Sequence, residues 1–495
     1  MRGLSATIIA VLLAALASPS AAEAPRPIAR TASGAVAGVR DGAVEVFKGL
    51  PYASQRRWEP PSPPRPWSGV RDASQFGPIC PQPVGPRRNL DQKQSEDCLY
   101  LNVWTFAGAR KAPVMVWIHG GAFRFGSGSQ RFYDGADFAK DGVVLVSINY
   151  RLGALGAFAH PALVNAVAPN APIGDYGLMD QIAALKWVQR NIAAFGGDPA
   201  NVTVFGESAG GLSVLTLMAT PSARGLFAKA VVESGGGWEA ERTLAQAEKA
   251  GVALAEAAGL GPDATLGQLR AIPVEKLLQA PLTLGGAGPF VDGRLLKEDV
   301  TQAFAAGREA PVPLMIGSNS YEASLMAPFK VAPSAMLRLA ASDRSLYPAD
   351  DAKAAADVFT DAIMGAPAQW LAARQSRLAR VYLYHFSYVP TAQRSTRPGA
   401  AHGSEIPFVF GAWPAIFNRF ASPQDHAVER LMHACWVAFA KTGAPSCGDL
   451  AWPAYAPASG ETMEFGLRSG ALAHFRQAQY DALDASFLPR LLAAP

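Results

Sequence analysis

The chain has 495 residues, of which 49% are hydrophobic and 17% are charged, and it contains 24 Phe, 12 Tyr and 10 Trp. This composition excludes an intrinsically disordered protein. The net charge is small, 44 − 40 = +4, and argues against nucleic-acid binding or a polybasic membrane patch. The four cysteines lack metal-ligand spacing. We therefore expect a soluble globular enzyme or binding protein.

Residues 1–24 have the pattern of a signal peptide. Arg2 supplies a positive charge, residues 6–17 form an apolar run, and small residues suited to cleavage follow. The run is shorter than the roughly 20 residues that a membrane span needs, which disfavours the alternative of an uncleaved anchor. We expect export to the periplasm or the medium, with residues 25–495 forming a single domain.

If the protein is exported, we expect its cysteines to form disulfides, because an oxidising compartment favours these bonds. Cys80 and Cys98 flank a short polar segment, whereas Cys435 lies in a helical pattern and Cys447 in the loop after it. Local pairing, Cys80 with Cys98 and Cys435 with Cys447, is the simplest of the three possible connectivities. A buried free thiol at Cys435 is the alternative.

Short apolar segments alternate with helical patterns along the chain. Helical patterns cover Leu178–Phe195 and Ser213–Met218. This alternation predicts an α/β fold with a mostly parallel sheet covered by helices. Several of the strand candidates are nearly continuous apolar runs. The candidates are Pro113–His119, Val143–Asn149, Val202–Phe205, Ala228–Glu233, Val312–Ile316 and Val381–Tyr388.

Two Ala-rich helical regions, about Ala240–Ala280 and Pro333–Arg380, interrupt this alternation. No Gly/Ser-rich or Pro-rich linker separates either region from its neighbours. We therefore expect both regions to be insertions that cover one end of the sheet, rather than separate domains.

The segment Gly206-Glu207-Ser208-Ala209-Gly210 directly follows the strand candidate Val202–Phe205 and precedes an apolar helical run. This arrangement is typical of a nucleophile elbow, a sharp strand-to-helix turn with a glycine two residues to either side of the serine. The turn lifts the serine hydroxyl clear of the sheet and aims the next backbone N–H at the substrate oxygen. The pattern predicts that Ser208 is a nucleophile.

A second motif, His119-Gly120-Gly121-Ala122-Phe123, ends the strand candidate Pro113–His119. Its small residues let the backbone approach a ligand closely, and its N–H groups can complete an oxyanion hole. An ordinary glycine turn is the alternative. Acyl transfer needs both a nucleophile and an anion cradle, so the two motifs support each other.

A serine nucleophile also needs a base, and the base needs an acid that orients it. In hydrolases of this kind the acid and then the histidine follow the serine in the chain. His402 lies in a loop just beyond a strand candidate, where this fold presents catalytic groups. The other histidines after Ser208 lie in strand or helical patterns or near the C-terminus and are less well placed: His385, His426, His433 and His474.

Glu322 is the favoured acid, because it follows the strand candidate Val312–Ile316 through a short turn at residues 317–320. Asp292 is its competitor, but the Asp292-Gly293 pair is typical of a turn.

With these residues in place, the sequence resembles the type-B carboxylesterase family from about residue 32 to residue 455. The resemblance rests on three segments, residues 95–104, 195–211 and 402–408. It implies the α/β-hydrolase fold, with helical insertions that form a cap over an active-site gorge. It also implies hydrolysis of small carboxylic esters through an acyl-enzyme, without a metal ion or cofactor.

Carried over by position, the resemblance implies that Ser208 is the nucleophile, Glu322 the acid and His402 the base. It also implies a disulfide between Cys80 and Cys98. The remaining implied roles are oxyanion donors at Gly121, Ala122 and Ala209, a residue lining the site at Glu207, and a partner close to the triad at Ser234.

The sequence also departs from the family pattern. The segment between Cys80 and Cys98 lacks the tryptophan with which cholinesterases bind a cation, so choline esters are disfavoured. Asp175 stands where many relatives have Asn. Two alternatives stay open, a non-catalytic neuroligin-like adhesion protein and an amide or thioester hydrolase. Four aromatic residues are candidates for an apolar substrate pocket or for core packing: Phe123, Phe125, Phe290 and Trp238.

Overall fold

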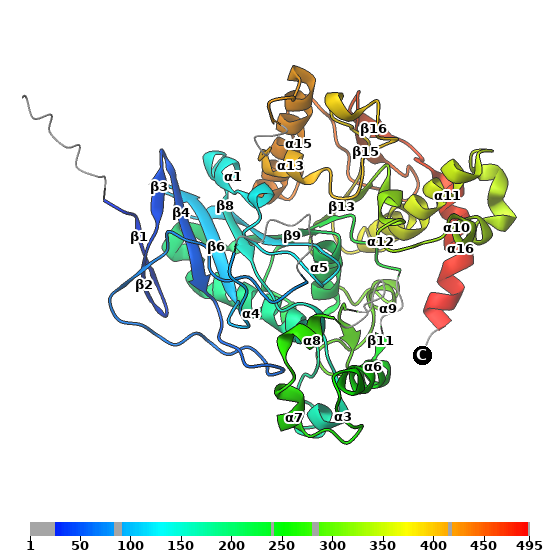
Figure 1. Ribbon diagram of the computed structural model, residues 1–495. Coiled ribbons are helices and arrows are strands. Elements are labelled where there is room, and N and C mark those ends of the chain that lie inside the picture. Colours follow the sequence, from blue (N-terminus) through cyan, green and yellow to red (C-terminus); the bar gives the residue numbers. More distant parts are fainter. Residues whose placement is uncertain (1–24, 84–91, 239–241, 280–286, 414–417, 494–495) are drawn as a thin grey trace, which may run out of the picture.

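The computed structural model describes residues 25–83, 92–238, 242–279, 287–413 and 418–493. The predicted signal peptide, residues 1–24, lies outside these ranges. An 11-stranded twisted sheet forms the centre of the molecule (Figure 1). From one edge to the other its strands are β16 (Gly470–Leu472), β15 (Thr462–Phe465), β14 (Val381–Phe386), β13 (Leu314–Asn319), β10 (Lys229–Glu233), β9 (Gly197–Glu207), β7 (Ala112–Ile118), β8 (Val144–Ile148), β6 (Tyr100–Phe106), β4 (Val44–Pro51) and β3 (Val39–Asp41).

The middle of the sheet is parallel and its two edges are antiparallel. All neighbouring strands from β15 across to β8 pair in parallel. The pairings β15–β16, β8–β6, β6–β4 and β4–β3 are antiparallel. The predicted α/β architecture is therefore confirmed, and each of the six strand candidates corresponds to one strand of the parallel part.

Helices cover both faces of the sheet, and alternate side chains of β7 show why. Val114, Val116 and Ile118 enter one apolar cluster, whereas Met115 and Trp117 enter the cluster on the opposite face. This two-residue alternation buries both faces of a strand. The first cluster includes α4 (Tyr176–Asn191), α5 (Ala209–Ala219) and α12 (Ala366–Gln375), and the second includes α1 (Ala136–Lys140), α13 (Ile406–Phe410) and α15 (Pro423–Thr442) (Figure 1).

Both Ala-rich regions are helical in the structure. The first holds α6 (Leu244–Ala257), α7 (Leu266–Arg270) and α8 (Val274–Leu278), and the second holds α10 (Pro333–Leu339), α11 (Asp351–Thr360) and α12. Helices α10 and α11 contact each other, and α11 also packs against the short 3-10 helix that carries Glu322. Helix α12 packs directly on β13 and β14, so this part of the second region belongs to the layer that covers the sheet.

Smaller elements complete the described ranges. No helix among them is long and apolar enough to span a membrane. Strands β1 (Ile28–Thr31), β2 (Gly34–Ala37) and β5 (Val70–Asp72) form one small sheet, and β11 (Arg242–Thr243) pairs with β12 (Phe290–Val291). The remaining α-helices are α2 (Gly153–Gly156), α3 (Pro161–Val164), α9 (Val300–Ala305) and α16 (Gln477–Ala493).

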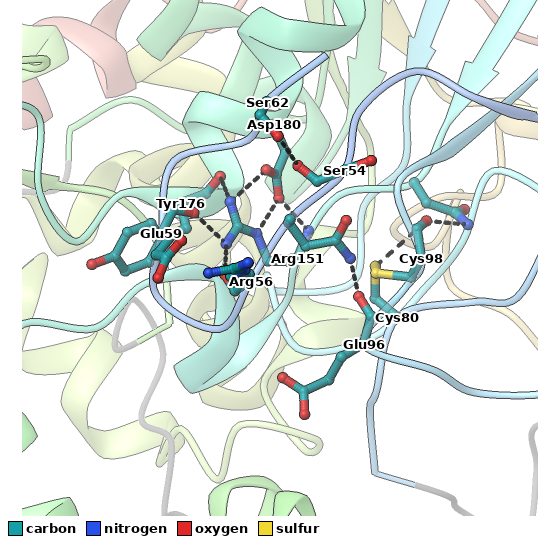
Figure 2. A network of polar contacts seen from close by, with 12 residues as sticks. Ser54, Arg56, Glu59, Ser62, Cys80, Glu96, Cys98, Arg151, Tyr176 and Asp180 are labelled. Carbon is teal, nitrogen blue, oxygen red and sulfur yellow. Dashed lines mark hydrogen bonds and ion pairs between the residues drawn. A yellow bond between two sulfur atoms is a disulfide. The ribbon is translucent and has the colours of Figure 1, made fainter. Parts of the chain in front are cut away.

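A buried ion pair fastens the N-terminal segment to α4 (Figure 2). The Arg151 guanidinium donates to both carboxylate oxygens of Asp180, at 2.7 and 2.8 Å, and these side chains are 4% and 0% exposed. The same guanidinium donates to the backbone oxygens of Arg56 and Glu59, at 3.3 and 2.8 Å. One cation thus joins the loop after β8, helix α4 and the segment at residues 56–59.

Two disulfides join nearby segments of the chain. Cys80 is bonded to Cys98, and Cys435, in α15, is bonded to Cys447 in the loop that follows. Among the described residues no cysteine is free.

Candidate active site

Ser208 stands at the sharp turn between β9 and α5. Its backbone has φ 58° and ψ −124°, a left-handed conformation that non-glycine residues rarely adopt. The two flanking glycines are needed for space, since a Cβ at Gly206 or Gly210 would approach the backbone oxygen of Ile118 to 2.6 or 2.0 Å. The Ser208 N–H donates to the Glu233 oxygen at 2.8 Å, which fixes the turn against β10. Ser208 itself is partly exposed.

Glu322 and His402, which are 80 positions apart in the chain, meet beyond the carboxyl ends of β13 and β14. Nδ1 of His402 lies 2.5 Å from Oε2 of Glu322. The other carboxylate oxygen of Glu322 accepts from the Ser234 hydroxyl at 2.5 Å and from the Asn319 N–H at 2.7 Å. The His402 N–H donates to the Ser324 hydroxyl at 3.0 Å. Both members of the pair are therefore fixed in orientation.

The other ring nitrogen of His402 faces the elbow. Nε2 lies 3.0 Å from Oε1 of Glu207 and makes no hydrogen bond within the described ranges. Glu207 directly precedes Ser208, and a Cβ at Gly120 would come within 2.6 Å of Glu207 Oε2 and 3.1 Å of Ser208 Cβ. The histidine, the elbow and the glycine loop after β7 therefore lie next to one another.

Buried carboxylates dominate the electrostatics around His402. Burial disfavours the charged imidazole of His402, but Glu207, Glu322 and Glu405 outweigh this effect and raise the pKa of His402 above its ordinary value. Burial raises the pKa of Glu207 to about 7 and that of Glu405 to about 8. The site therefore stabilises a proton on His402.

The glycine loop after β7 presents free backbone donors. Gly121, Ala122 and Phe123 all have positive φ values, 110°, 54° and 55°. In the described part of the chain, the N–H groups of Gly121 and Ala122 donate no hydrogen bond. Ala209 is the first residue of α5, where a helical N–H has no partner within its own helix. These are the three donors predicted for an oxyanion hole.

The rejected candidates for the acid and the base have other partners. Asp292 accepts hydrogen bonds from the backbone N–H groups of residues 173, 294, 295 and 296, so its carboxylate braces the loop before α9. His433 lies 2.7 Å from the Val409 oxygen, and His426 pairs with Glu429 at 2.8 Å. His385 is buried against Phe475.

Two of the four aromatic pocket candidates are core residues. Phe290 is fully buried, and Trp238 is buried and stacks on Phe487. Phe123 instead lines a small cavity of about 20 Å³, next to Asp175. Asp175 accepts the Phe290 N–H at 3.0 Å through one oxygen, while burial raises the pKa of its carboxyl well above the ordinary range.

Three polar residues around the proposed triad were not predicted from the sequence. Ser324 accepts the His402 N–H, and Asn319 donates to both Glu322 and Glu405. Only Glu405 had a signal, its place three residues after His402 in the third family segment. Within the described ranges, no group of three or more His, Cys, Asp or Glu side chains is placed to hold a metal ion.

Comparisons with known proteins identify the family of the chain. The model of the carboxylesterase family matches residues 25–347 and 334–483. Para-nitrobenzyl esterase of Bacillus subtilis (strain 168) is 38% identical over 470 residues, covering 88% of this chain and 94% of that protein. Fumonisin B1 esterase of Sphingopyxis macrogoltabida is 37% identical over 509 residues, covering 95% of this chain and 92% of that protein.

Solved structures show the same architecture. A PNB esterase superposes with a TM-score of 0.82 at 34% identity, covering 92% of this chain and 99% of that one. A carboxylesterase of Geobacillus stearothermophilus gives a TM-score of 0.81 at 35% identity, covering 92% and 100%. These matches extend over nearly the whole chain and identify its fold as that of the α/β-hydrolases. The chain belongs to the carboxylesterase family.

Proposed function

We propose that this protein hydrolyses carboxylic esters with Ser208 as nucleophile, His402 as base and Glu322 as acid. The observation that carries the proposal is the 2.5 Å contact between His402 Nδ1 and Glu322 Oε2, which leaves Nε2 directed at the elbow. Ester hydrolysis as the general activity follows from the family.

The reaction proceeds in two steps. His402 Nε2 takes the proton of the Ser208 hydroxyl as its oxygen attacks the ester carbonyl, and the carboxylate of Glu322 stabilises the imidazolium that forms. The imidazolium then protonates the leaving alcohol, which gives an acyl-enzyme. Water, deprotonated by His402, attacks this ester, and the acid product leaves with Ser208 restored.

The backbone donors of Gly121, Ala122 and Ala209 hold the negative oxygen of each tetrahedral intermediate. Loss of one donor typically costs about 3 kcal/mol of transition-state stabilisation. The N–H groups of Gly121 and Ala122 support this role, because neither donates a hydrogen bond within the described ranges.

A panel of p-nitrophenyl esters of increasing acyl length tests the function, with a matched p-nitroanilide beside each ester. We expect release of p-nitrophenol from the esters and slower release from the anilides. Hydrolysis of anilides at equal rates would identify an amidase instead. The absence of all turnover in folded protein would favour the neuroligin-like adhesion alternative.

Replacing Glu207 with glutamine is expected to move the acid limb of kcat/KM to lower pH, by about 1 to 3 pH units. Glu207 raises the pKa of His402, and the base must be neutral to act. Removal of the carboxylate charge lowers that pKa, so neutral His402 persists at more acidic pH. The pH profile of kcat/KM measures the shift. A limb that stays in place or moves to higher pH would contradict the assignment.

We also propose that the chain is exported and loses residues 1–24. The two disulfides support this proposal, because such bonds persist in oxidising compartments. To test both statements, the protein is purified from each compartment of its native host and its N-terminal sequence is determined. A retained Met1 in a cytosolic fraction would contradict them.

A further inference from the structure

A second cavity lies apart from the proposed triad. It has a volume of about 510 Å³ and is bounded by α4, the proline-rich segment at residues 60–63 and the loop at residues 294–297. This volume falls within the range of roughly 300–1,000 Å³ that is typical of small-molecule sites. The buried side chains of Tyr52, Met179, Ile182 and Leu295 line it. No residue of the proposed triad or oxyanion hole does.

One face of α4 forms a wall of this cavity. Met179, Ile182, Ala183, Lys186 and Arg190 all line it, and the spacing of three, four, seven and eleven residues from the first puts them on the same side of the helix. The first three are apolar and the last two are cationic. The wall therefore passes from apolar to positively charged along the helix.

Four cations surround the cavity, and no aspartate or glutamate lines it. Lys186 and Arg190 come from α4, whereas Arg294 and Lys297 come from the loop before α9. Among the described residues, none of the four forms an ion pair. The Arg294 side chain donates one hydrogen bond, to the Ala171 oxygen at 3.0 Å. An apolar cavity with uncompensated cations complements a ligand with an apolar body and an anionic end.

We propose that this cavity is a binding site for an amphipathic carboxylate, a fatty-acid anion of medium chain length. The alkyl chain packs over Met179, Ile182 and Leu295, and the carboxylate meets Lys186 and Arg190. The choice of a carboxylate over other anions rests on the proposed function, because ester hydrolysis releases carboxylates. The apolar lining and the cations themselves do not depend on it.

Calorimetric titration of the Ser208→Ala variant tests the site without turnover. The probes are octanoate, decanoate and dodecanoate, each below its micellar concentration. Affinity is expected to rise by up to about fourfold for each further methylene that becomes buried. Dodecanol and dodecyltrimethylammonium are expected to bind at least about tenfold more weakly than dodecanoate, since each lacks the anionic end. Equal binding of the cationic probe, or no binding of dodecanoate, would overturn the proposal.

Variants of the cavity wall show whether dodecanoate binds in this cavity or in the proposed active site. In the Ser208→Ala background, the pair Lys186→Glu and Arg190→Glu should weaken dodecanoate binding at least about tenfold. Ala183→Trp should weaken dodecanoate binding to a similar extent, because the indole fills the cavity. Lys249→Glu, at an exposed position on α6, is a charge-reversal control away from the cavity and should leave binding unchanged.

Two further measurements distinguish a failed binding proposal from a misfolded variant and from a failed proposal of ester hydrolysis. Melting curves identify any wall variant that fails to fold, and such a variant is replaced by Ile182→Phe, which reduces the cavity with less change in shape. Folded wall variants that bind dodecanoate as tightly as their parent would overturn the proposed site. The ester turnover of wild-type protein tests the proposed function, and its loss in the Ser208→Ala variant is independent of this binding result.

Discussion

Replacing Ser208 with alanine is expected to lower kcat for p-nitrophenyl ester hydrolysis by at least about 10⁴-fold, because the acyl-enzyme can no longer form. The variant should fold, since alanine keeps the Cβ atom that the turn at φ 58° already accommodates. Steady-state kinetics, with a melting curve for each protein, measure the effect. Any residual rate should come from binding and from the oxyanion donors, which the substitution leaves in place.

Ser222→Ala is the matched control for this experiment. Ser222 is an exposed serine in the 3-10 helix after α5, and it belongs to none of the proposed catalytic groups. Its loss should change kcat less than twofold. Turnover by Ser208→Ala at a rate near that of the Ser222→Ala protein would exclude Ser208 as the nucleophile.

Replacing Arg151 with alanine is expected to cost about 3–5 kcal/mol of unfolding free energy. The substitution leaves Asp180 buried without its partner and removes the donors that hold the backbone oxygens of Arg56 and Glu59 (Figure 2). Denaturant unfolding under non-reducing conditions measures the loss. Of the ion pairs described here, this one is the most completely buried, so it should have the largest effect.

Two comparisons test the reason for that loss. The double variant Arg151→Met with Asp180→Leu should recover much of the stability, because it removes both buried charges. Lys140→Ala, which breaks an exposed pair with Asp137, should cost less than about 1 kcal/mol. If Arg151→Ala lost no more stability than Lys140→Ala, the buried pair would not hold these segments together.

The parallel centre of the sheet could be predicted from the sequence, whereas its two antiparallel edges could not. Strands such as β7 and β8 are buried on both faces and read as continuous apolar runs. Strand β4, which lies next to the short edge strand β3, includes Glu45 and Lys48, and both side chains are partly accessible. Strand β9 begins five residues earlier than the prediction, because its polar start at Gly197 pairs with Ala112 in the ladder with β7.

The proposed catalytic residues could be predicted because each lies in a local motif beside a strand end. Their supporting contacts arise only in the tertiary structure. Ser324 and His402, for example, are 78 positions apart and are joined by one backbone-to-hydroxyl hydrogen bond. No spacing rule links two such loops. The same holds for Asp292, whose turn context was recognised but whose four backbone partners were not.

Covalent labelling with a fluorophosphonate, followed by mass spectrometry of the peptides, tests the proposed activation of the elbow serine most directly. We predict a single phosphonyl adduct on the peptide that carries Ser208, formed with loss of fluoride. In the variant His402→Ala the same peptide should react at least about 10³-fold more slowly, because the base that activates the hydroxyl is gone. Labelling of another residue, or unchanged labelling without His402, would contradict the account.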